Sequence, residues 1–187
     1  MAPKCSFECQ CGTMKWHIND GAQGRHVMCY CADCQSEIRH LHQEDSYLKN
    51  GGTQIFQTLP SDFVFDDGLD QLALMRLGPK GLLRWYAKCC NTPIANTLPA
   101  PTLPFVGVVL PTGHDHFGRI SAYANTEAAS VKVRQRGVVG AIYSLFFRAA
   151  KSALTGTGKN TPFFDANKAP IVEPTVLTLE QREAARP

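Results

Sequence analysis

The stretch Cys29-Tyr30-Cys31-Ala32-Asp33-Cys34 brings three cysteines together within six residues of chain. Thiolates held this close by local backbone can occupy three positions of a tetrahedral zinc ion and leave the fourth position free. Catalytic zinc sites are usually built in this way. We therefore expect a zinc site formed by Cys29, Cys31 and Cys34, with a position left for water or a substrate thiol.

Two further cysteine clusters lie far from this stretch in the sequence. They are Cys9-Gln10-Cys11-Gly12 and Cys89-Cys90-Asn91-Thr92-Pro93, and only tertiary folding can bring them beside the first stretch or into a second site. Eight cysteines in a secreted protein of this size would indicate disulfides, but C-x-C and C-x-x-C spacings in a reducing cytosol more often bind metal. We therefore favour metal, and the sequence leaves open whether it is zinc or iron.

The composition is that of one folded domain with appendages. With 187 residues, of which 44% are hydrophobic, the chain is long enough for one full hydrophobic core. The formal net charge of +3 is small, and Lys and Arg are dispersed among Asp and Glu. We therefore expect no nucleic-acid partner.

No targeting or membrane-spanning segment is evident in the sequence. Residues 1–8 lack the basic start and the apolar run of a secretion signal, which predicts a cytoplasmic location. The longest uncharged apolar run, Gly137 to Phe147, is well short of the roughly 20 residues that cross a bilayer. We therefore expect no transmembrane helix.

Short strand-like stretches predict a mainly β protein. Met14, Trp16 and Ile18 alternate with polar neighbours, as in a half-buried strand. A strand from Arg25 to Tyr30 leads into the triple-cysteine stretch, and a helix over Asp33 to Gln43 is expected to follow it. The other expected strands are Gln54 to Thr58, Phe63 to Phe65, Leu72 to Leu77, Leu82 to Ala87 and Phe105 to Leu110.

The character of the chain changes from Ser130 onward. Apolar side chains there recur at helical spacing, and the charged side chains up to Lys151 are all positive. The apolar residues are Val138, Ile142, Leu145, Phe146 and Ala149, and the basic ones are Lys132, Arg134, Arg136, Arg148 and Lys151. We expect a basic helix, followed by an irregular loop over residues 155–170 and a short helix over residues 178–184.

These patterns divide the chain into a zinc-binding domain over residues 1–128 and a basic helical extension over residues 129–187. We expect the extension to pack on the domain or on a partner subunit, the latter making a homo-oligomer. Peripheral attachment of the helix to an anionic membrane is the alternative.

The three cysteine clusters, in their order along the chain, resemble the motifs of one known family. A C-x-C-G pair, a C-x-C-x-x-C stretch some twenty residues later and a cysteine before Thr-Pro resemble the glutathione-dependent formaldehyde-activating enzyme family, which also includes centromere protein V. The family's third motif usually reads as an aromatic residue followed by C-x-x-C-G-T-P. In this chain Ala87 occupies the position of the first of these cysteines, and Asn91 occupies the position of the glycine. The resemblance, over about the first 110 residues, is to a divergent branch of that family.

The resemblance implies a β-tent fold, in which small antiparallel sheets surround two zinc sites. The catalytic ligands would be the three thiolates of the C-x-C-x-x-C stretch. The structural ligands, carried over by position, would be Cys9, Cys11 and Cys90. A fourth thiolate from Cys89 or Cys5 is favoured, although Cys89 and the adjacent Cys90 can bind one ion only where the backbone turns. A three-thiolate site completed by water or a histidine, and loss of the structural metal, are the alternatives.

The resemblance also implies an activity. It is that of a zinc-dependent carbon–sulfur lyase, similar to S-hydroxymethylglutathione synthase, acting on glutathione adducts of formaldehyde or a related small aldehyde. Zinc would lower the pKa of a substrate thiol bound at its fourth position. The alternative is a non-catalytic binding module that zinc stabilises. An open or water-filled fourth position on the ion held by Cys29, Cys31 and Cys34 would favour the enzyme, and a fourth protein ligand there would favour the module.

Five polar residues near these motifs are weaker candidates, and none is assigned a catalytic role. Asp33 lies inside the first motif, and Arg39 and His40 follow it on the expected helix. His114 and His116 form a His-x-His pair. Side chains of these types on surface helices and loops are usually solvated, so we expect the cysteines alone to define the sites.

Overall fold

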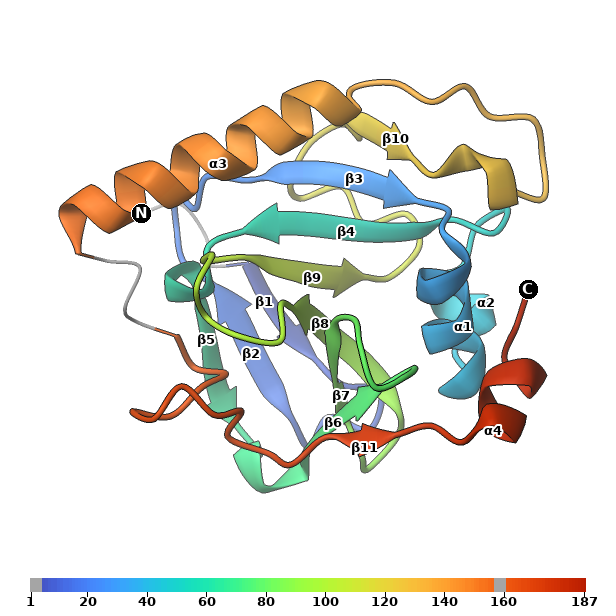
Figure 1. The fold of residues 1–187 in the computed structure, drawn as a ribbon, viewed down its shortest axis with the longest axis horizontal. Helices are drawn as coiled ribbons and strands as arrows, with labels where there is room; N and C mark the ends of the chain where they lie inside the picture. Colours follow the sequence, from blue (N-terminus) through green and yellow to red (C-terminus); the bar gives the residue numbers. More distant parts are fainter. Residues whose placement is uncertain (1–4, 157–160) are drawn as a thin grey trace.

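The computed structural model describes residues 5–156 and 161–187 (Figure 1). The first four residues, on which the expected cytoplasmic location partly depends, lie outside the described residues, as do residues 157–160 of the expected loop. Within the described ranges, no helix combines the length and the apolar character that crossing a bilayer requires.

In the described part of the chain, eight strands form the larger of two sheets (Figure 1). Strands from β3 to β6 in this sheet pair antiparallel, whereas the short edge strands β10 and β11 pair in parallel with β3 and β6. The spatial order is β10 (Ala122–Ala124), β3 (Arg25–Cys29), β4 (Thr53–Thr58), β9 (Val106–Leu110), β8 (Thr92–Thr97), β7 (Leu83–Ala87), β6 (Leu72–Arg76) and β11 (Thr175–Val176).

The smaller sheet is antiparallel and packs against the larger one. Its order is β1 (Cys5–Glu8), β2 (Lys15–Ile18) and β5 (Phe63–Asp67). One core contains Trp16 and Phe63 from this sheet and Trp85 and Val108 from the larger sheet, all fully or nearly fully buried. Large aromatic side chains contribute much apolar area, so this core fixes the two sheets relative to each other.

Helices α1, α2 and α4 lie at one end of the larger sheet, and α3 lies along one edge (Figure 1). The long helix α3 contacts β3 and β10, and α1 contacts the terminal helix α4. The helices are α1 (Ala32–His40), α2 (Glu44–Tyr47), α3 (Val138–Thr155) and α4 (Leu179–Ala184), with short 3-10 turns at η1 (Pro60–Asp62), η2 (Leu69–Gln71) and η3 (Thr126–Ala128).

The expectation of a mainly β protein with antiparallel sheets and a C-terminal helix is confirmed. The expected strands and the Val138–Thr155 helix are present, and α1 ends at His40 rather than at Gln43. Sequence reasoning missed β8, because Pro93 argues against an internal strand. The ladder tolerates this proline because β9 pairs only with Ala95 to Thr97 and the β7–β8 register shifts between Trp85 and Tyr86.

Gly68 connects β5 to η2 in a left-handed conformation that favours glycine, at a point where the chain of the β1–β2 turn comes close. Its φ is +70°, and a Cβ built on it would lie 2.4 Å from the Thr13 carbonyl oxygen. We expect Gly68→Ala to lower the free energy of unfolding by about 1–3 kcal/mol, measured by urea denaturation. Gly113 is the matched control, since its φ is +83° but a Cβ there would meet nothing within 4 Å. Equal costs for the two alanine variants would contradict the contact with Thr13.

Candidate metal centres

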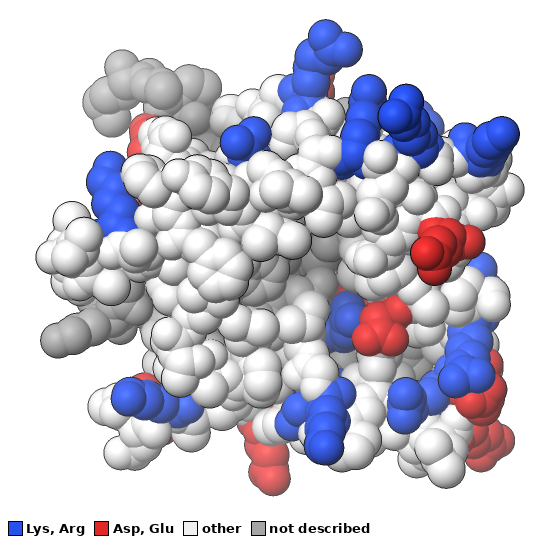
Figure 2. All heavy atoms as spheres, turned by 45° about the horizontal axis from the view of Figure 1, so that its top comes forward, with Lys and Arg blue, Asp and Glu red and all other residues white. Residues whose placement is uncertain are grey.

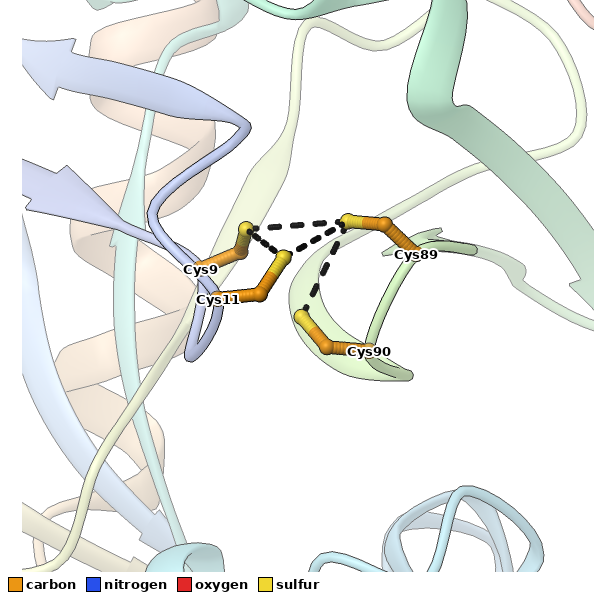
Figure 3. A group of neighbouring side chains, drawn as sticks. All are labelled: Cys9, Cys11, Cys89 and Cys90. Atoms are coloured by element: carbon orange, nitrogen blue, oxygen red, sulfur yellow. Dashed lines mark hydrogen bonds between the residues drawn. The ribbon is translucent and has the colours of Figure 1, made fainter.

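The first cysteine group brings together two turns that are far apart in the sequence. The sulfur atoms of Cys9, Cys11, Cys89 and Cys90 all lie within 4.8 Å of one another (Figure 3). Cys89 Sγ is 3.3 Å from Cys11 Sγ, 3.7 Å from Cys9 Sγ and 3.8 Å from Cys90 Sγ, and Cys9 Sγ is 3.5 Å from Cys11 Sγ. We call these residues the four-thiolate group.

These distances fit ligands of one metal ion better than they fit disulfides. Four sulfurs at the usual zinc–sulfur distance of about 2.3 Å from one ion are about 3.8 Å apart in a tetrahedron. A disulfide would hold two of them at about 2.05 Å. All eight cysteines are free thiols. The four-thiolate group can therefore hold a metal ion.

Local backbone geometry places the first pair of cysteines side by side, with Cys9 buried and Cys11 exposed. Residues 9–14 form the tight turn between β1 and β2, closed by hydrogen bonds from Cys9 N to Met14 O and from Gly12 N to Cys9 O. Gly12 has a φ of +74°, which a left-handed turn position requires. The backbone N–H of Met14 also donates to Cys9 Sγ at 3.2 Å. This turn fixes the position of Cys9 Sγ and places Cys11 Sγ 3.5 Å from it.

The second pair lies in the turn between β7 and β8. Asn91 has a φ of 57°, and asparagine is one of the few residues that tolerates this left-handed conformation. The turn allows the adjacent side chains of Cys89 and Cys90 to approach one another, as the sequence-based choice of Cys89 required (Figure 3). Asn91 therefore lets this tight turn form without a glycine.

Hydroxyl groups support both halves of the four-thiolate group. The Thr92 hydroxyl lies 3.1 Å from Cys90 Sγ and accepts a hydrogen bond from the backbone N–H of Gln10 at 3.0 Å. Burial acts to raise the pKa of Cys90, but hydrogen bonds, led by that with Thr92, outweigh it and lower the pKa. Hydrogen bonds with Thr13 lower the pKa of Cys11 to about 6. Both effects favour the thiolate forms that bind metal.

The second cysteine group consists of Cys29, Cys31 and Cys34. Cys29 Sγ is 3.4 Å from Cys31 Sγ and 3.7 Å from Cys34 Sγ, and all three sulfurs lie within 4.8 Å of one another. Cys29 and Cys34 are buried, whereas Cys31 is partly exposed. We call them the three-thiolate group; within the described residues, no other Cys, His, Asp or Glu joins it.

The junction between β3 and α1 produces this geometry. Cys29 ends β3, and Cys31 is the N-cap of α1, where its Sγ accepts a hydrogen bond from the backbone N–H of Cys34 at 3.4 Å. The free N–H groups and the dipole at a helix N-terminus favour negative charge. A strand, a short turn and a helix start therefore suffice to place the three sulfurs together.

Of the three thiols, Cys29 is the one whose pKa its neighbours lower. Hydrogen bonding with Cys31 and Cys34 lowers the pKa of Cys29 to about 3, and the Asn125 side chain, whose Nδ2 is 3.6 Å from Cys29 Sγ, acts in the same direction. The interaction with Cys29 raises the pKa values of Cys31 and Cys34. A bound cation would offset this repulsion and favour all three thiolates.

A buried ion pair lies behind the three-thiolate group. The Arg84 guanidinium donates a hydrogen bond to the Glu37 carboxylate, to which Asn96 Nδ2 also donates at 3.1 Å; all three side chains are buried. Burial raises the pKa of Glu37 against the opposing effect of Arg84. The pKa of Arg84 rises, because Glu37 and Cys34 outweigh its burial. Arg84 therefore remains a cation that faces both the carboxylate and the cysteine group.

Sequence reasoning missed four of the residues that hold these groups in place. Gln35 Nε2 donates to Tyr30 O at 2.9 Å and to Ala128 O at 2.8 Å, tying α1 to the segment that carries Asn125. Gln43 Nε2 donates to Cys90 O at 3.1 Å and to Gln10 Oε1 at 3.1 Å, bridging the turns of the four-thiolate group. No short motif signals these contacts. The residues are Gln35, Glu37, Gln43 and Asn125.

The weaker candidates from the sequence lie outside both groups. Cys5 is in β1, with its Sγ 3.8 Å from His114 Nε2, and burial raises its pKa to about 11. Asp33 is exposed and 3.9 Å from Arg84, and Arg39 donates to the Arg186 carbonyl oxygen. His40 and His116 likewise belong to neither cysteine group.

The fold and these two groups define a mainly β protein with two cysteine groups that can hold metal ions. The chain belongs to a family of unknown function (DUF6151), whose model matches residues 1–141. No curated protein matches the chain. A crystal structure of a Rhodobacter sphaeroides protein, a structural genomics target, is 18% identical with a TM-score of 0.40, and the match covers 62% of this chain and 96% of that one.

Proposed function

We propose that both cysteine groups bind zinc, with a structural ion in the four-thiolate group and a reactive ion in the three-thiolate group. The number of thiolates in each group supports the assignment of one structural and one reactive ion. Four sulfurs complete a tetrahedral zinc ion, as in structural sites, whereas three sulfurs leave a position for an exchangeable ligand, as in catalytic sites.

We assign to the reactive ion a carbon–sulfur lyase chemistry on glutathione adducts of formaldehyde or a related small aldehyde. The support is the order and spacing of the cysteine motifs, which resemble those of the glutathione-dependent formaldehyde-activating enzymes. In this reaction the sulfur of the thiol attacks the aldehyde carbon, and a carbon–sulfur bond forms. The carbonyl oxygen becomes a hydroxyl by taking the proton that the thiol gave up. The reverse reaction releases both reactants.

The residues around the three-thiolate group suit such a site. Three thiolates leave a zinc complex with one negative charge, and a bound substrate thiolate would add another. The Asn125 amide next to Cys29, the start of α1 and the Arg84 cation near Cys34 are the neighbouring groups that favour negative charge. Because Arg84 is buried, its role is to stabilise the thiolates and not to contact substrate. The partly exposed side of Cys31 is the side from which a thiol can approach.

A non-catalytic module stabilised by zinc is the second candidate. The burial of Cys29 and Cys34 favours it, since it limits approach to the ion from most directions. In that case no substrate thiol would bind at the fourth position, and the two ions would serve to hold the sheets and α1 together.

Metal content and thiol exchange test the proposal together. We expect two zinc ions per chain in the wild-type protein and one in Cys29→Ser. We also expect the zinc-loaded protein to accelerate exchange between glutathione, formaldehyde and S-hydroxymethylglutathione, measured by exchange NMR, and Cys29→Ser to return the rate to the uncatalysed value.

Cys5→Ser is the matched control, because Cys5 is also buried but lies in neither group. It should keep both ions and the full exchange rate. A Cys29→Ser protein that retained two ions would remove the basis of the proposed reactive site. Two ions without any acceleration, and without a glutathione-dependent change in the spectrum of the cobalt-substituted protein, would instead establish the non-catalytic module.

A further inference from the structure

The long helix α3 packs on the sheet with its small and polar side and leaves its large apolar side chains exposed. Its buried residues are Ala141, Arg148, Ala149 and Ser152. The exposed residues include Val139, Tyr143 and Leu154, which are 83%, 71% and 90% exposed. An ordinary surface helix has the opposite arrangement. The apolar face of α3 therefore lacks a cover among the described residues.

The exposed apolar side chains form one stripe along the helix. They recur at helical spacing over more than four turns, and the rings of Tyr143 and Phe147 stack with centroids 6.4 Å apart. The stripe consists of Val139, Ile142, Tyr143, Phe146, Phe147 and Leu154. Contiguous exposed apolar patches of this kind mark protein or membrane interaction sites.

Positive charge surrounds this stripe. The sequence has no acidic residue between Glu127 and Asp165, whereas Lys132, Arg134 and Lys151 are exposed. Figure 2, which brings α3 forward, shows a broad uncharged surface with Lys and Arg gathered above it and few acidic groups. An apolar face with a basic margin is complementary to an anionic interface.

A groove of about 730 Å³ runs beside the stripe, between α3 and the segment that leads into β3. Phe147 of the stripe lines it together with Arg25, Arg148 and Lys151, and Asp62 supplies the single carboxylate. The Asp62 carboxylate already accepts a hydrogen bond from the Thr58 hydroxyl at 2.9 Å. The groove therefore has a net positive charge next to an exposed aromatic side chain.

Arg148 is the buried cation that lines this groove. The side chain is only 6% exposed, and its Nη2 donates to the Gln57 carbonyl oxygen at 3.2 Å. Its Nε is buried and has no hydrogen-bond partner within the described part of the chain. Its Nη1 also donates to Ser144 Oγ at 2.5 Å, so Arg148 adds fixed positive charge to the groove, and the exposed Arg25 and Lys151 are the cations that a phosphate group can reach.

We propose that α3 docks on an anionic phospholipid surface. The stripe enters the boundary between headgroups and acyl chains, with the helix parallel to the membrane, and the groove takes a lipid phosphate. A second copy of the chain is a poorer occupant, because a symmetric dimer through this face would bring identical basic margins together. This inference is independent of the chemistry proposed for the cysteine groups.

Sedimentation of the zinc-loaded protein with lipid vesicles tests the proposal. We expect binding to vesicles of phosphatidylcholine with phosphatidylserine, little binding to phosphatidylcholine alone, and weaker binding as salt is raised. Replacing both Phe146 and Phe147 by serine should weaken binding more than tenfold, since each ring loses its apolar burial. Lys151→Ala should weaken it about fivefold at low salt.

Two variants at the far edge of the sheet are matched controls. Leu179→Ser removes a side chain that is 76% exposed at the start of α4, and Lys80→Ala removes an exposed cation after β6. Both should bind within twofold of the wild type. Failure to bind phosphatidylserine vesicles, equal binding to neutral vesicles, or equal losses in the controls would overturn the proposal. So would a dimer in buffer that the double serine variant abolishes, because a second copy would then cover the stripe.

Discussion

Cys9→Ser is expected to remove one metal ion and to lower the free energy of unfolding by on the order of 5 kcal/mol. Cys9 is 1% exposed and lies in the β1–β2 turn of the smaller sheet, while Cys89 and Cys90 lie in the β7–β8 turn of the larger sheet. A metal ion in the four-thiolate group would therefore join the two sheets. Its binding free energy is then available only to the folded chain, so it adds to stability.

The measurement pairs metal analysis with unfolding in the presence of excess zinc. For a chain of this length, the expected loss corresponds to a fall in Tm of about 10–20 °C. Cys5→Ser should keep both ions and lose far less stability, although Cys5 is also buried and lies in the neighbouring strand β1. A Cys9→Ser protein with unchanged metal content and unchanged Tm would show that the four-thiolate group holds no stabilising ion.

Arg84→Met is expected to destabilise the protein by about 3–5 kcal/mol, because it leaves the Glu37 carboxylate buried without its cation. The pair lies between the core of the larger sheet and α1, and Glu37 Oε1 and Arg84 Nε already lack partners within the described residues. The remaining hydrogen bond from Asn96 does not neutralise the charge. The loss should appear in urea denaturation, with a smaller secondary effect on the metal affinity of the three-thiolate group.

The double variant with Glu37→Leu and Arg84→Met separates pairing from packing. Replacing both charges by apolar groups removes the unpaired carboxylate, so the double variant should be more stable than Arg84→Met alone. If the two variants were equally unstable, lost packing and not the buried charge would explain the result. Retention of full stability in Arg84→Met would show that the ion pair contributes nothing to the fold.

Much of the three-thiolate group could be predicted from the sequence, since its geometry is local. The C-x-C-x-x-C spacing, the strand before it and the helix after it lie within residues 25–40, and the structure brings the three sulfurs within 4.8 Å of one another. The mainly β character was also predictable, because alternating apolar residues and turn signals report on local backbone preference. Strand β8 was not predictable, because Pro93 argues against a strand. The sheet accommodates this proline only because β9 pairs with β8 from Ala95 onward, which the sequence does not show.

The sequence by itself determined which residues are able to bind metal, where most of the strands lie and that an apolar, basic helix follows residue 130. Only the tertiary structure decided that Cys89 joins Cys9, Cys11 and Cys90, that Asn125 and Arg84 lie beside the three-thiolate group, and that α3 exposes its apolar face. The physical reason is the range of the interactions. Spacing and backbone preference act within a few residues, whereas the packing of one sheet on another fixes which distant turns meet and which helix face is covered.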